Sequence, residues 1–292
     1  MSDLVGHKKV KKYFKNLIDQ DLLGHAYIFH GSEMIGKRTF AMDLYALINR
    51  GSRIQGDPDL FILSSNIKED DEKKEEEEEV SDVIKISSIR QLKSFFSLSP
   101  YLGPYRMAII DDAHKMNSEA SNALLKVLEE PPKNAILILI TSKPSFLPRT
   151  IQSRCEKVRF GSLNNEEILE LLNNQKITKE DKDFIIKISN GRPGMAKFLS
   201  DQNNLKLAKD SISNLRNLLK GSISDRMKYA GDLSGSNNYE QTLSYWLDWV
   251  YASLRASDKN YLMVKKLLNL VNANSQIGIN KRLSLENFLI NI

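Results

Sequence analysis

Apolar residues in the first part of the chain form two kinds of pattern, a helical spacing and a short continuous run. The spacing of apolar residues is helical over residues 7–23 and 37–49, whereas residues 26–29 form a short apolar run. Helical spacing predicts an amphipathic helix, and a short apolar run followed by glycine predicts a buried strand. The chain therefore begins with helix, strand and helix, and a glycine-containing loop joins the last two.

The same alternation of strand and helix continues further along the chain. Residues 106–110 and 135–140 are apolar runs typical of buried strands, and residues 118–130 between them have helical spacing. Pro131 and Pro132 end this helix, because proline cannot continue it. Strands that alternate with helices favour a parallel sheet covered by helices. We therefore expect an α/β fold class for this part.

After residue 160 the strand patterns stop and only helical spacing remains. Short helices, interrupted at residues 191–194, give way to longer amphipathic helices toward the C-terminus. We expect three parts in chain order: an α/β base domain over residues 1–161, a small helical lid domain over residues 162–204, and an all-α domain over residues 205–292.

The charge is distributed unevenly. Residues 66–82 are a low-complexity acidic stretch, and residues 68–79 within it hold nine acidic residues and three lysines, a net charge of −6. Like charges repel and leave little to bury, so we interpret the stretch as a solvated insertion or a frayed helix. Since the whole chain carries +5, the remainder carries +11. That excess is compatible with nucleic acid, and equally with a generally lysine-rich protein.

The apolar runs, the N-terminus and the cysteine count indicate in which cellular compartment the protein resides. No apolar run approaches the ~18–20 residues that span a bilayer, and the charged N-terminus lacks the apolar core of a signal peptide. Cys155 is the single cysteine, which rules out an internal disulfide and a cysteine-cluster zinc site. We expect a cytoplasmic protein with no membrane partner.

The loop between the first predicted strand and the second helix carries the clearest candidate chemistry. It reads Gly31-Ser-Glu-Met-Ile-Gly36-Lys37-Arg38-Thr39, which matches the pattern G-x-x-x-x-G-K of a phosphate-binding loop. Glycines let the backbone wrap a phosphate, and the positive end of the following helix adds to the attraction. Lys37 is expected to reach the β- and γ-phosphates. A chance glycine turn is the alternative.

One position of this loop departs from the pattern. The hydroxyl residue that holds Mg²⁺ normally follows the lysine directly, and here that residue is Arg38. Thr39 comes one position later, and a helix turns by ~100° per residue, so its hydroxyl points elsewhere. Arginine cannot ligate magnesium. We therefore expect any binding of ATP and Mg²⁺ to be weak.

Polar residues follow two of the predicted strands. Asp111 ends an apolar run, which is where a phosphate-loop protein holds Mg²⁺ through water, and Asp112 stands where a water-polarising acid is expected. The alternative is a strand that ends in two capping acids. Ser142 follows the next strand and is a candidate sensor of the γ-phosphate.

Several segments together resemble bacterial clamp-loader subunits of the AAA+ class, most of all the delta prime subunits of DNA polymerase III. The resemblance rests on Gly-His-x-x-Val near the N-terminus, HAYIFHG before the loop, the segment 84–132, and TSKPSFLPRTIQSRC at residues 141–155. It extends from about residue 4 to 200 and is most specific over residues 84–160. The helical remainder agrees in length and class with the collar domain of those proteins.

The resemblance implies a role for Arg154 of the Ser-Arg-Cys motif. In that family this arginine enters the ATP site of a neighbouring subunit and stabilises the γ-phosphate charge as an arginine finger. A structural arginine near a strand end is the alternative. The implied partners are other clamp-loader subunits of the delta and gamma/tau types, a sliding clamp, and primer-template DNA contacted without sequence preference.

The sequence departs from the family in its zinc module and its lid. Many delta prime subunits carry four zinc-binding cysteines after the loop helix, and this stretch has none, so we expect no zinc. The family's usual lid arginine is Met195 here, while Arg192 lies three residues earlier, which puts phosphate sensing from the lid in doubt. Arg149 adds a further charge near Arg154 that has no explanation in the sequence.

These observations leave two functions in competition. In the first, the chain is a stator-like clamp-loader subunit that offers Arg154 to a neighbour while its own site binds nucleotide weakly or not at all. In the second, it is an active AAA+ motor subunit, which Lys37 and Asp111 favour and which Arg38, Asp112 and Met195 oppose. A small-molecule kinase would leave the Ser-Arg-Cys motif and the helical C-terminus unexplained.

Overall fold

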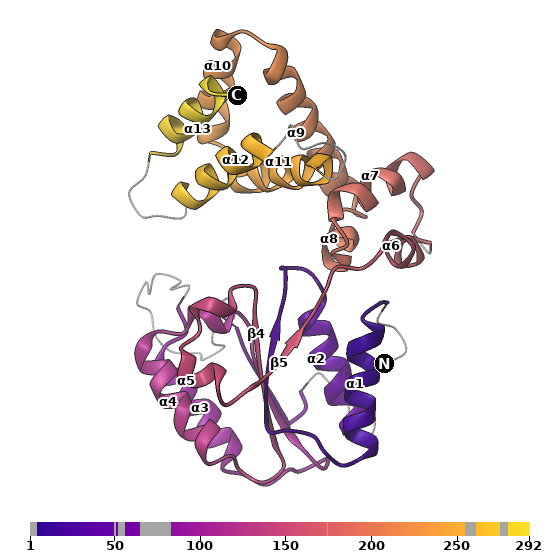
Figure 1. Cartoon of the computed structure of the whole chain (residues 1–292), viewed down its shortest axis with the longest axis vertical. Helices are drawn as coiled ribbons and strands as arrows, with labels where there is room; N and C mark the ends of the chain where they lie inside the picture. The colour runs from indigo at the N-terminus through magenta and orange to yellow at the C-terminus, as the bar shows by residue number, and fades with distance from the viewer. Residues whose placement is uncertain are drawn as a thin grey trace. The chain divides into compact units, whose positions relative to one another are not determined.

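The computed structural model describes residues 5–49, 51, 56–64, 83–173, 175–254, 261–274 and 280–292 (Figure 1). The chain divides into two compact units, Met1–Leu163 and Asn164–Ile292. The acidic stretch 66–82, predicted to be a solvated insertion or a frayed helix, lies outside the described residues. None of the described helices is both long and apolar enough to cross a membrane.

The first unit is built on a parallel five-stranded sheet. Its strands are β1 (Ala26–His30), β2 (Leu60–Leu63), β3 (Arg106–Ile110), β4 (Ala135–Thr141) and β5 (Glu156–Arg159), in the spatial order β2-β3-β4-β1-β5. The strand β1 pairs with β4, Ile28 lying opposite Leu139, and with β5 on its other side. Because every pairing is parallel, the carboxyl ends of all five strands share one edge of the sheet.

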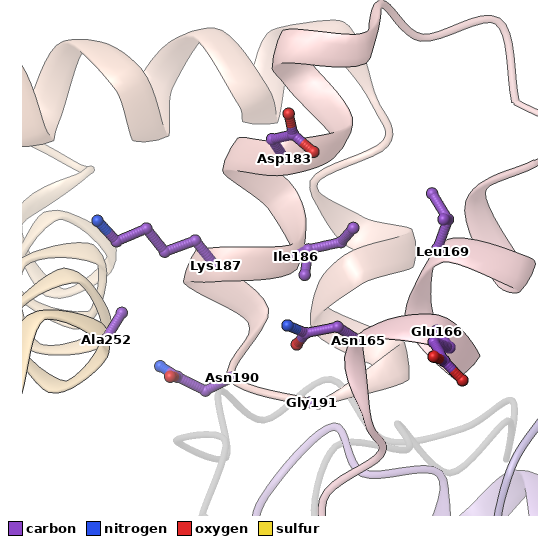
Figure 2. Close-up of a pocket in the computed structure, with 9 residues that line it drawn as sticks. All are labelled: Asn165, Glu166, Leu169, Asp183, Ile186, Lys187, Asn190, Gly191 and Ala252. Carbon is purple, nitrogen blue, oxygen red and sulfur yellow. The ribbon is translucent and has the colours of Figure 1, made fainter. Parts of the chain in front are cut away.

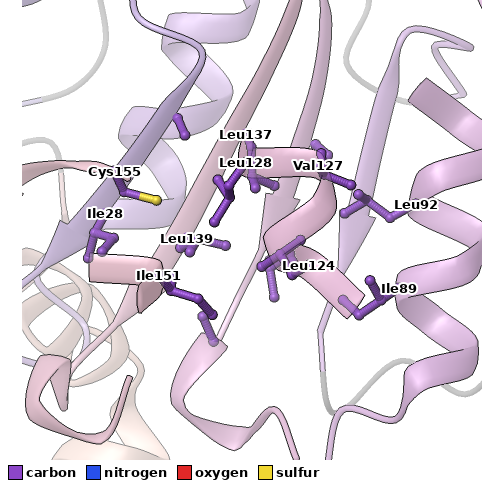
Figure 3. Close-up of a cluster of buried hydrophobic side chains, with 14 of the residues drawn as sticks. Ile28, Ile89, Leu92, Leu124, Val127, Leu128, Leu137, Leu139, Ile151 and Cys155 are labelled. Atoms are coloured by element: carbon purple, nitrogen blue, oxygen red, sulfur yellow. The ribbon is translucent and has the colours of Figure 1, made fainter. Parts of the chain in front are cut away.

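Helices cover both faces of this sheet (Figure 1). They are α1 (Lys8–Asp19), α2 (Lys37–Ile48), α3 (Ile86–Phe96), α4 (Ser118–Glu129) and α5 (Arg149–Gln152), with 3₁₀ turns η1 (Ala113–Lys115) and η2 (Pro144–Phe146). Alternate strand residues point to opposite faces. One face packs against α1 and α2 through a cluster that includes Phe14, Phe29 and Phe40. The other packs against α3, α4 and α5 (Figure 3), where Ile28 and Leu139 belong to the cluster.

The predicted α/β fold class is confirmed, and most predicted element bounds agree to within one residue. The first helix is the main exception, because α1 ends at Asp19 rather than at Leu23. Asp21 adopts a left-handed backbone with φ of 53°, which breaks the helix there. The sequence pattern did not predict β2, β5 and α3.

The second unit is helical throughout the residues described. Its helices are α6 (Asn165–Leu172), α7 (Lys179–Ser189), α8 (Pro193–Phe198), α9 (Gln202–Lys220), α10 (Ile223–Ser234), α11 (Tyr239–Leu254), α12 (Tyr261–Asn274) and α13 (Lys281–Ile290). Trp246 is fully buried in its core, and its indole N–H donates to the carbonyl of Ser211 at 2.8 Å. The division into a lid (162–204) and a collar (205–292) stays a prediction.

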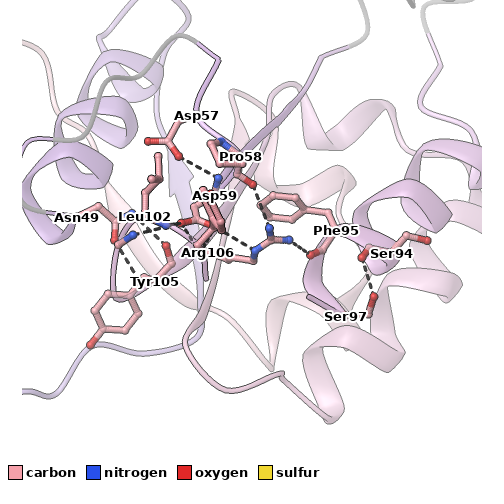
Figure 4. A network of polar contacts seen from close by, with 12 residues as sticks. Asn49, Asp57, Pro58, Asp59, Ser94, Phe95, Ser97, Leu102, Tyr105 and Arg106 are labelled. Carbon is pink, nitrogen blue, oxygen red and sulfur yellow. Dashed lines mark hydrogen bonds and ion pairs between the residues drawn. The ribbon is translucent and has the colours of Figure 1, made fainter. Parts of the chain in front are cut away.

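A buried ion pair fixes the amino ends of β2 and β3 (Figure 4). Asp59 is fully buried and accepts hydrogen bonds from the backbone N–H groups of residues 101–103 at 2.6–3.2 Å. It also accepts from Nε of Arg106 at 3.2 Å, while the rest of that guanidinium donates to the carbonyls of Phe95 and Pro58. Burial alone would raise the pKa of Asp59, but these donors outweigh it and hold the pKa below its usual range.

Replacing Asp59 by Asn should destabilise the first unit, because it leaves the buried Arg106 without its charge partner. We expect the free energy of unfolding to fall by about 3 kcal/mol at neutral pH. A carboxyl whose folded pKa is lowered stabilises above its unfolded pKa, and this contribution is lost as the pH falls through the folded value. The variant should therefore lose less stability than the wild type on acidification.

Urea unfolding followed by far-UV circular dichroism measures this change. Both tryptophans, Trp246 and Trp249, lie in the second unit, so their fluorescence follows that unit separately. Asp19→Asn, at an exposed position on α1, is the matched control and should change stability by less than about 0.5 kcal/mol. Equal unfolding midpoints for the two variants would contradict the role given to Asp59.

Candidate functional site

The loop between β1 and α2 has the backbone that its glycines predict. Gly31 has a φ of 147°, and a Cβ added there would lie 2.5 Å from the carbonyl oxygen of Phe160. Gly36 has a φ of 98° and forms the N-cap of α2. Only glycine adopts these conformations at low cost, so both positions shape the loop. The close approach of Gly31 to Phe160 also ties the loop to the end of β5.

Lys37 lies inside this loop. Its side chain is buried, and its Nζ donates to the carbonyl oxygens of Gly31 and Ser32, both at 2.7 Å. Burial lowers the pKa of Lys37 below its usual range, and the nearby carboxylates of Asp111 and Glu33 oppose that shift. Lys37 thus lies within the glycine-flanked loop and contacts its backbone, and its contact with a phosphate stays a prediction.

Arg38 contacts the acid at the end of β3. Its Nη1 lies 3.5 Å from Oδ2 of Asp111, and the side chains are 49% and 21% exposed, respectively. Burial raises the pKa of Asp111, the neighbouring charge of Asp112 raises it further, and Arg38 opposes both. Thr39 is exposed one position further along α2. The residues next to Asp111 thus fit a guanidinium, and they do not fit a hydroxyl-ligated Mg²⁺ ion.

Two more of the predicted phosphate-site residues lie at the same edge of the sheet. Asp112 has a left-handed backbone at the start of η1, and its carboxylate pairs with Lys115 at 3.2 Å. Ser142, directly after β4, donates to Oε1 of Glu33 in the loop at 3.1 Å. The parallel sheet therefore brings Ser142 to the loop. The water-polarising and sensing roles of Asp112 and Ser142 stay predictions.

Sequence reasoning missed two polar residues of this edge. Oγ1 of Thr141 lies 3.2 Å from Nδ1 of His114, and it also accepts from the backbone N–H of Lys143 at 3.0 Å. His114 stands two residues after Asp112 and joins the ends of β3 and β4. Its position two residues after the acidic pair was the available signal. Within the described residues, no cluster of three or more acidic, histidine or cysteine side chains could hold a metal ion.

Arg154 lies at the surface of the first unit, between α5 and β5. Its Nη2 pairs with Oε1 of Glu129 at 2.9 Å, and its Nη1 donates to the carbonyl of Thr150 at 3.1 Å. The side chain is 37% exposed. The polar contacts of Arg154 are thus with the end of α4 and with α5, and not with the loop that holds Lys37. Arg149 is exposed at the start of α5, and nothing in the structure explains its presence.

Arg192 lies in the second unit, where it forms the N-cap of α8. Its Nη2 pairs with Oδ2 of Asp248 at 2.7 Å, and its Nε donates to the carbonyl of Ser189 at 2.9 Å. Burial raises the pKa of Asp248, and the guanidinium of Arg192 opposes that shift. Arg192 is therefore already engaged within its own unit, and its contact with a phosphate stays a prediction. Met195 is buried.

An open pocket of about 480 Å³ lies in the second unit (Figure 2). Residues of both charge signs line it, together with polar and apolar side chains: Asn165, Glu166, Leu169, Asp183, Ile186, Lys187, Asn190, Gly191 and Ala252. They come from α6, α7, the following turn and α11, so no local sequence pattern predicts the pocket.

Gly31→Ala tests the loop geometry. The added Cβ would meet the Phe160 carbonyl in a backbone conformation that alanine avoids, so we expect a loss of about 1–3 kcal/mol in the stability of the first unit. Gly161→Ala is the matched control, because a Cβ there has no atom within 4 Å. Urea unfolding followed by circular dichroism compares them. A Gly31→Ala variant as stable as Gly161→Ala would contradict the close packing of Gly31 against the Phe160 carbonyl.

Comparison with known proteins agrees with this geometry. The profile of the family described as "DNA polymerase III, delta subunit" matches residues 6–164. Tau of DNA polymerase III from Bacillus subtilis is 30% identical over 179 residues, 59% of this chain and 31% of that protein. The gamma/tau subunit of Mycoplasma genitalium is 31% identical over 226 residues, 76% of this chain and 37% of that protein. The chain thus spans about a third of the length of these relatives.

Two solved structures share the fold. A DNA polymerase III gamma subunit-related protein of Thermotoga maritima has a TM-score of 0.56 at 18% identity, covering 95% of this chain and 97% of that chain. A point mutant of Thermotoga maritima RuvB has a TM-score of 0.51 at 15% identity, covering 99% of this chain and 89% of that chain. At such identities the likeness concerns the fold alone, a P-loop base of the AAA+ class followed by helices.

Proposed function

The chain belongs to the DNA polymerase III delta subunit family, and from that premise we propose that it is a clamp-loader subunit of the delta prime type. In this proposal it docks beside ATP-hydrolysing subunits and offers Arg154 to a neighbour's nucleotide. It thereby helps to load a sliding clamp onto primed DNA in the cytoplasm. Its own loop contributes little or no hydrolysis.

The ion pair between Arg38 and Asp111 is the observation that carries this proposal. An active P-loop ATPase uses a hydroxyl after the lysine and an aspartate at the strand end to hold Mg²⁺ against the β- and γ-phosphates. Here the arginine replaces the hydroxyl and its charge faces the aspartate. A site without its metal ligand loses most of the charge stabilisation that hydrolysis requires.

The position of Arg154 supports the second part of the proposal, its action in a neighbour's ATP site. Its partners Glu129 and Thr150 hold it near the surface of the base, and its partial exposure leaves the guanidinium within reach of another molecule. The pair with Glu129 is half exposed, and such pairs contribute no more than about 1 kcal/mol. A neighbour's γ-phosphate would therefore compete easily for this arginine.

The proposed contact with primer-template DNA is electrostatic. The helix α1 carries exposed lysines at four positions, Lys8, Lys9, Lys12 and Lys15. Lysine side chains bind phosphates without reading base sequence, and such binding weakens steeply with salt. The charge of α1 supports sequence-independent contact with DNA.

Arg154→Ala in a reconstituted clamp loader tests the finger. We expect ATP turnover at the neighbouring site to fall by a factor on the order of 10³, because a trans-acting arginine contributes about that much to phosphoryl transfer. The measurement is ATPase activity stimulated by primed DNA and clamp, with assembly checked by size-exclusion chromatography. Arg149→Ala removes a nearby exposed charge and should keep full activity. Unchanged turnover in a correctly assembled Arg154→Ala complex would rule the finger out.

A motor subunit that hydrolyses ATP by itself is the second candidate function. The position of Lys37 inside a well-formed loop favours it. The proposal above predicts that the isolated chain turns over ATP far below ~1 s⁻¹, the low end of ordinary enzyme rates. It also predicts that Lys37→Ala changes this background little. Turnover near that rate, abolished by Lys37→Ala, would instead establish the motor function.

A further inference from the structure

The charges around the loop raise the question of what replaces the metal ion. Arg38 is the second residue of α2, directly after Lys37, and its guanidinium reaches Asp111 across the loop. In a metal-dependent P-loop the cation lies between the strand-end aspartate and the phosphates. In this chain a side-chain cation already faces that aspartate.

A divalent ion and Arg38 cannot both use Asp111 favourably. The two positive charges would repel each other at short distance, and the hydroxyl that would complete the coordination is missing. Asp111 is partly buried beside Asp112, whose charge raises the pKa of Asp111, and Arg38 is the cation that opposes this shift. Arg38 therefore competes with a metal ion for Asp111, at a site that already lacks the hydroxyl ligand after Lys37.

Arg38 has the geometry to do more than exclude a metal. A guanidinium carries five N–H donors in a planar fork and remains charged at every accessible pH. Contact with Asp111 through Nη1 uses part of the fork, and the side chain is 49% exposed, so other donors are open to a ligand. Lys37, the loop amides and the N-terminus of α2 add positive potential on the same side.

We propose that the loop at residues 31–39 binds a nucleoside triphosphate free of any divalent cation, with Arg38 bridging Asp111 and the phosphate oxygens. The inference rests on the proposed function only in treating residues 31–39 as a nucleotide-binding loop. It assigns Arg38 the electrostatic task that Mg²⁺ performs in a hydrolysing site. Bound nucleotide is then held without being positioned for hydrolysis, and it stabilises the fold of a stationary subunit.

Binding of a fluorescent ATP analogue to the purified full chain tests this directly. Titrations are run at matched ionic strength, once with excess Mg²⁺ and once with excess EDTA. The wild type should give dissociation constants that agree within a factor of about two. Arg38→Thr restores a hydroxyl after Lys37, so Mg²⁺ should strengthen its binding by about tenfold or more, which corresponds to ~1.4 kcal/mol. In EDTA its binding should be weaker than that of the wild type.

Two further variants separate this effect from general charge or folding. Arg90→Thr makes the same charge change at an exposed position on α3 and should bind as the wild type does under both conditions. Lys37→Ala should bind weakly under both. The proposal is overturned if Mg²⁺ strengthens wild-type binding tenfold, if the wild type binds under neither condition, or if Arg38→Thr matches the wild type. None of these outcomes bears on Arg154, whose test uses the neighbouring site.

Discussion

Parallel pairing of β1 between β4 and β5 is the constraint on which the candidate site depends. This register places His30 opposite Thr141 and opposite Arg159, so the loops after three strands start at one level. Gly31 then has to pass the carbonyl of Phe160 at a distance that admits no side chain. The loop is therefore shaped by the sheet, and the lysine, acids and serine meet there although they lie far apart in the sequence.

The charge and size of the Lys37 and Arg38 side chains decide whether this loop suits a phosphate, a metal ion or both. Lys37 keeps the place that a phosphate-binding lysine needs, and Arg38 alters the place that a metal needs. A threonine or serine in place of Arg38 would leave Asp111 available to a hydrated ion. In the proposed function, this single arginine leaves the site able to bind nucleotide but not to hydrolyse it. The chemistry we assign to this chain then rests on Arg154, whose partners lie outside the loop.

The sequence predicted the parts of the fold whose side chains are buried on a regular period. β1, β3 and β4 are fully or almost fully buried apolar runs, and they were predicted with nearly correct bounds. The strand β5 was missed because Val158 is its one buried residue and charged residues surround it. The end of α1 was overestimated because Leu22 and Leu23 continue the apolar spacing, and only the backbone of Asp21 stops the helix.

The candidate site likewise contains features that the sequence predicted and features that it did not. The loop, Asp111 and Ser142 follow from motifs, because a parallel sheet gathers the residues after its strands. The pairs Arg38–Asp111, Arg154–Glu129, Arg192–Asp248 and Asp59–Arg106 could not be read from the sequence. Each joins residues that are distant in the chain, so each depends on packing and not on a local pattern. Arg192 shows the consequence, since a residue considered as a phosphate sensor proves to be paired within the helical unit.

The central claim is that this chain acts in a neighbour's ATP site through Arg154. The most direct test is a structure of the assembled clamp loader with a non-hydrolysable ATP analogue. The account predicts that the Arg154 guanidinium leaves Glu129 and donates to a γ-phosphate oxygen of the adjacent subunit at about 2.7–2.9 Å. An Arg154 that stays paired with Glu129, beside a neighbouring nucleotide contacted by no arginine of this chain, would contradict it.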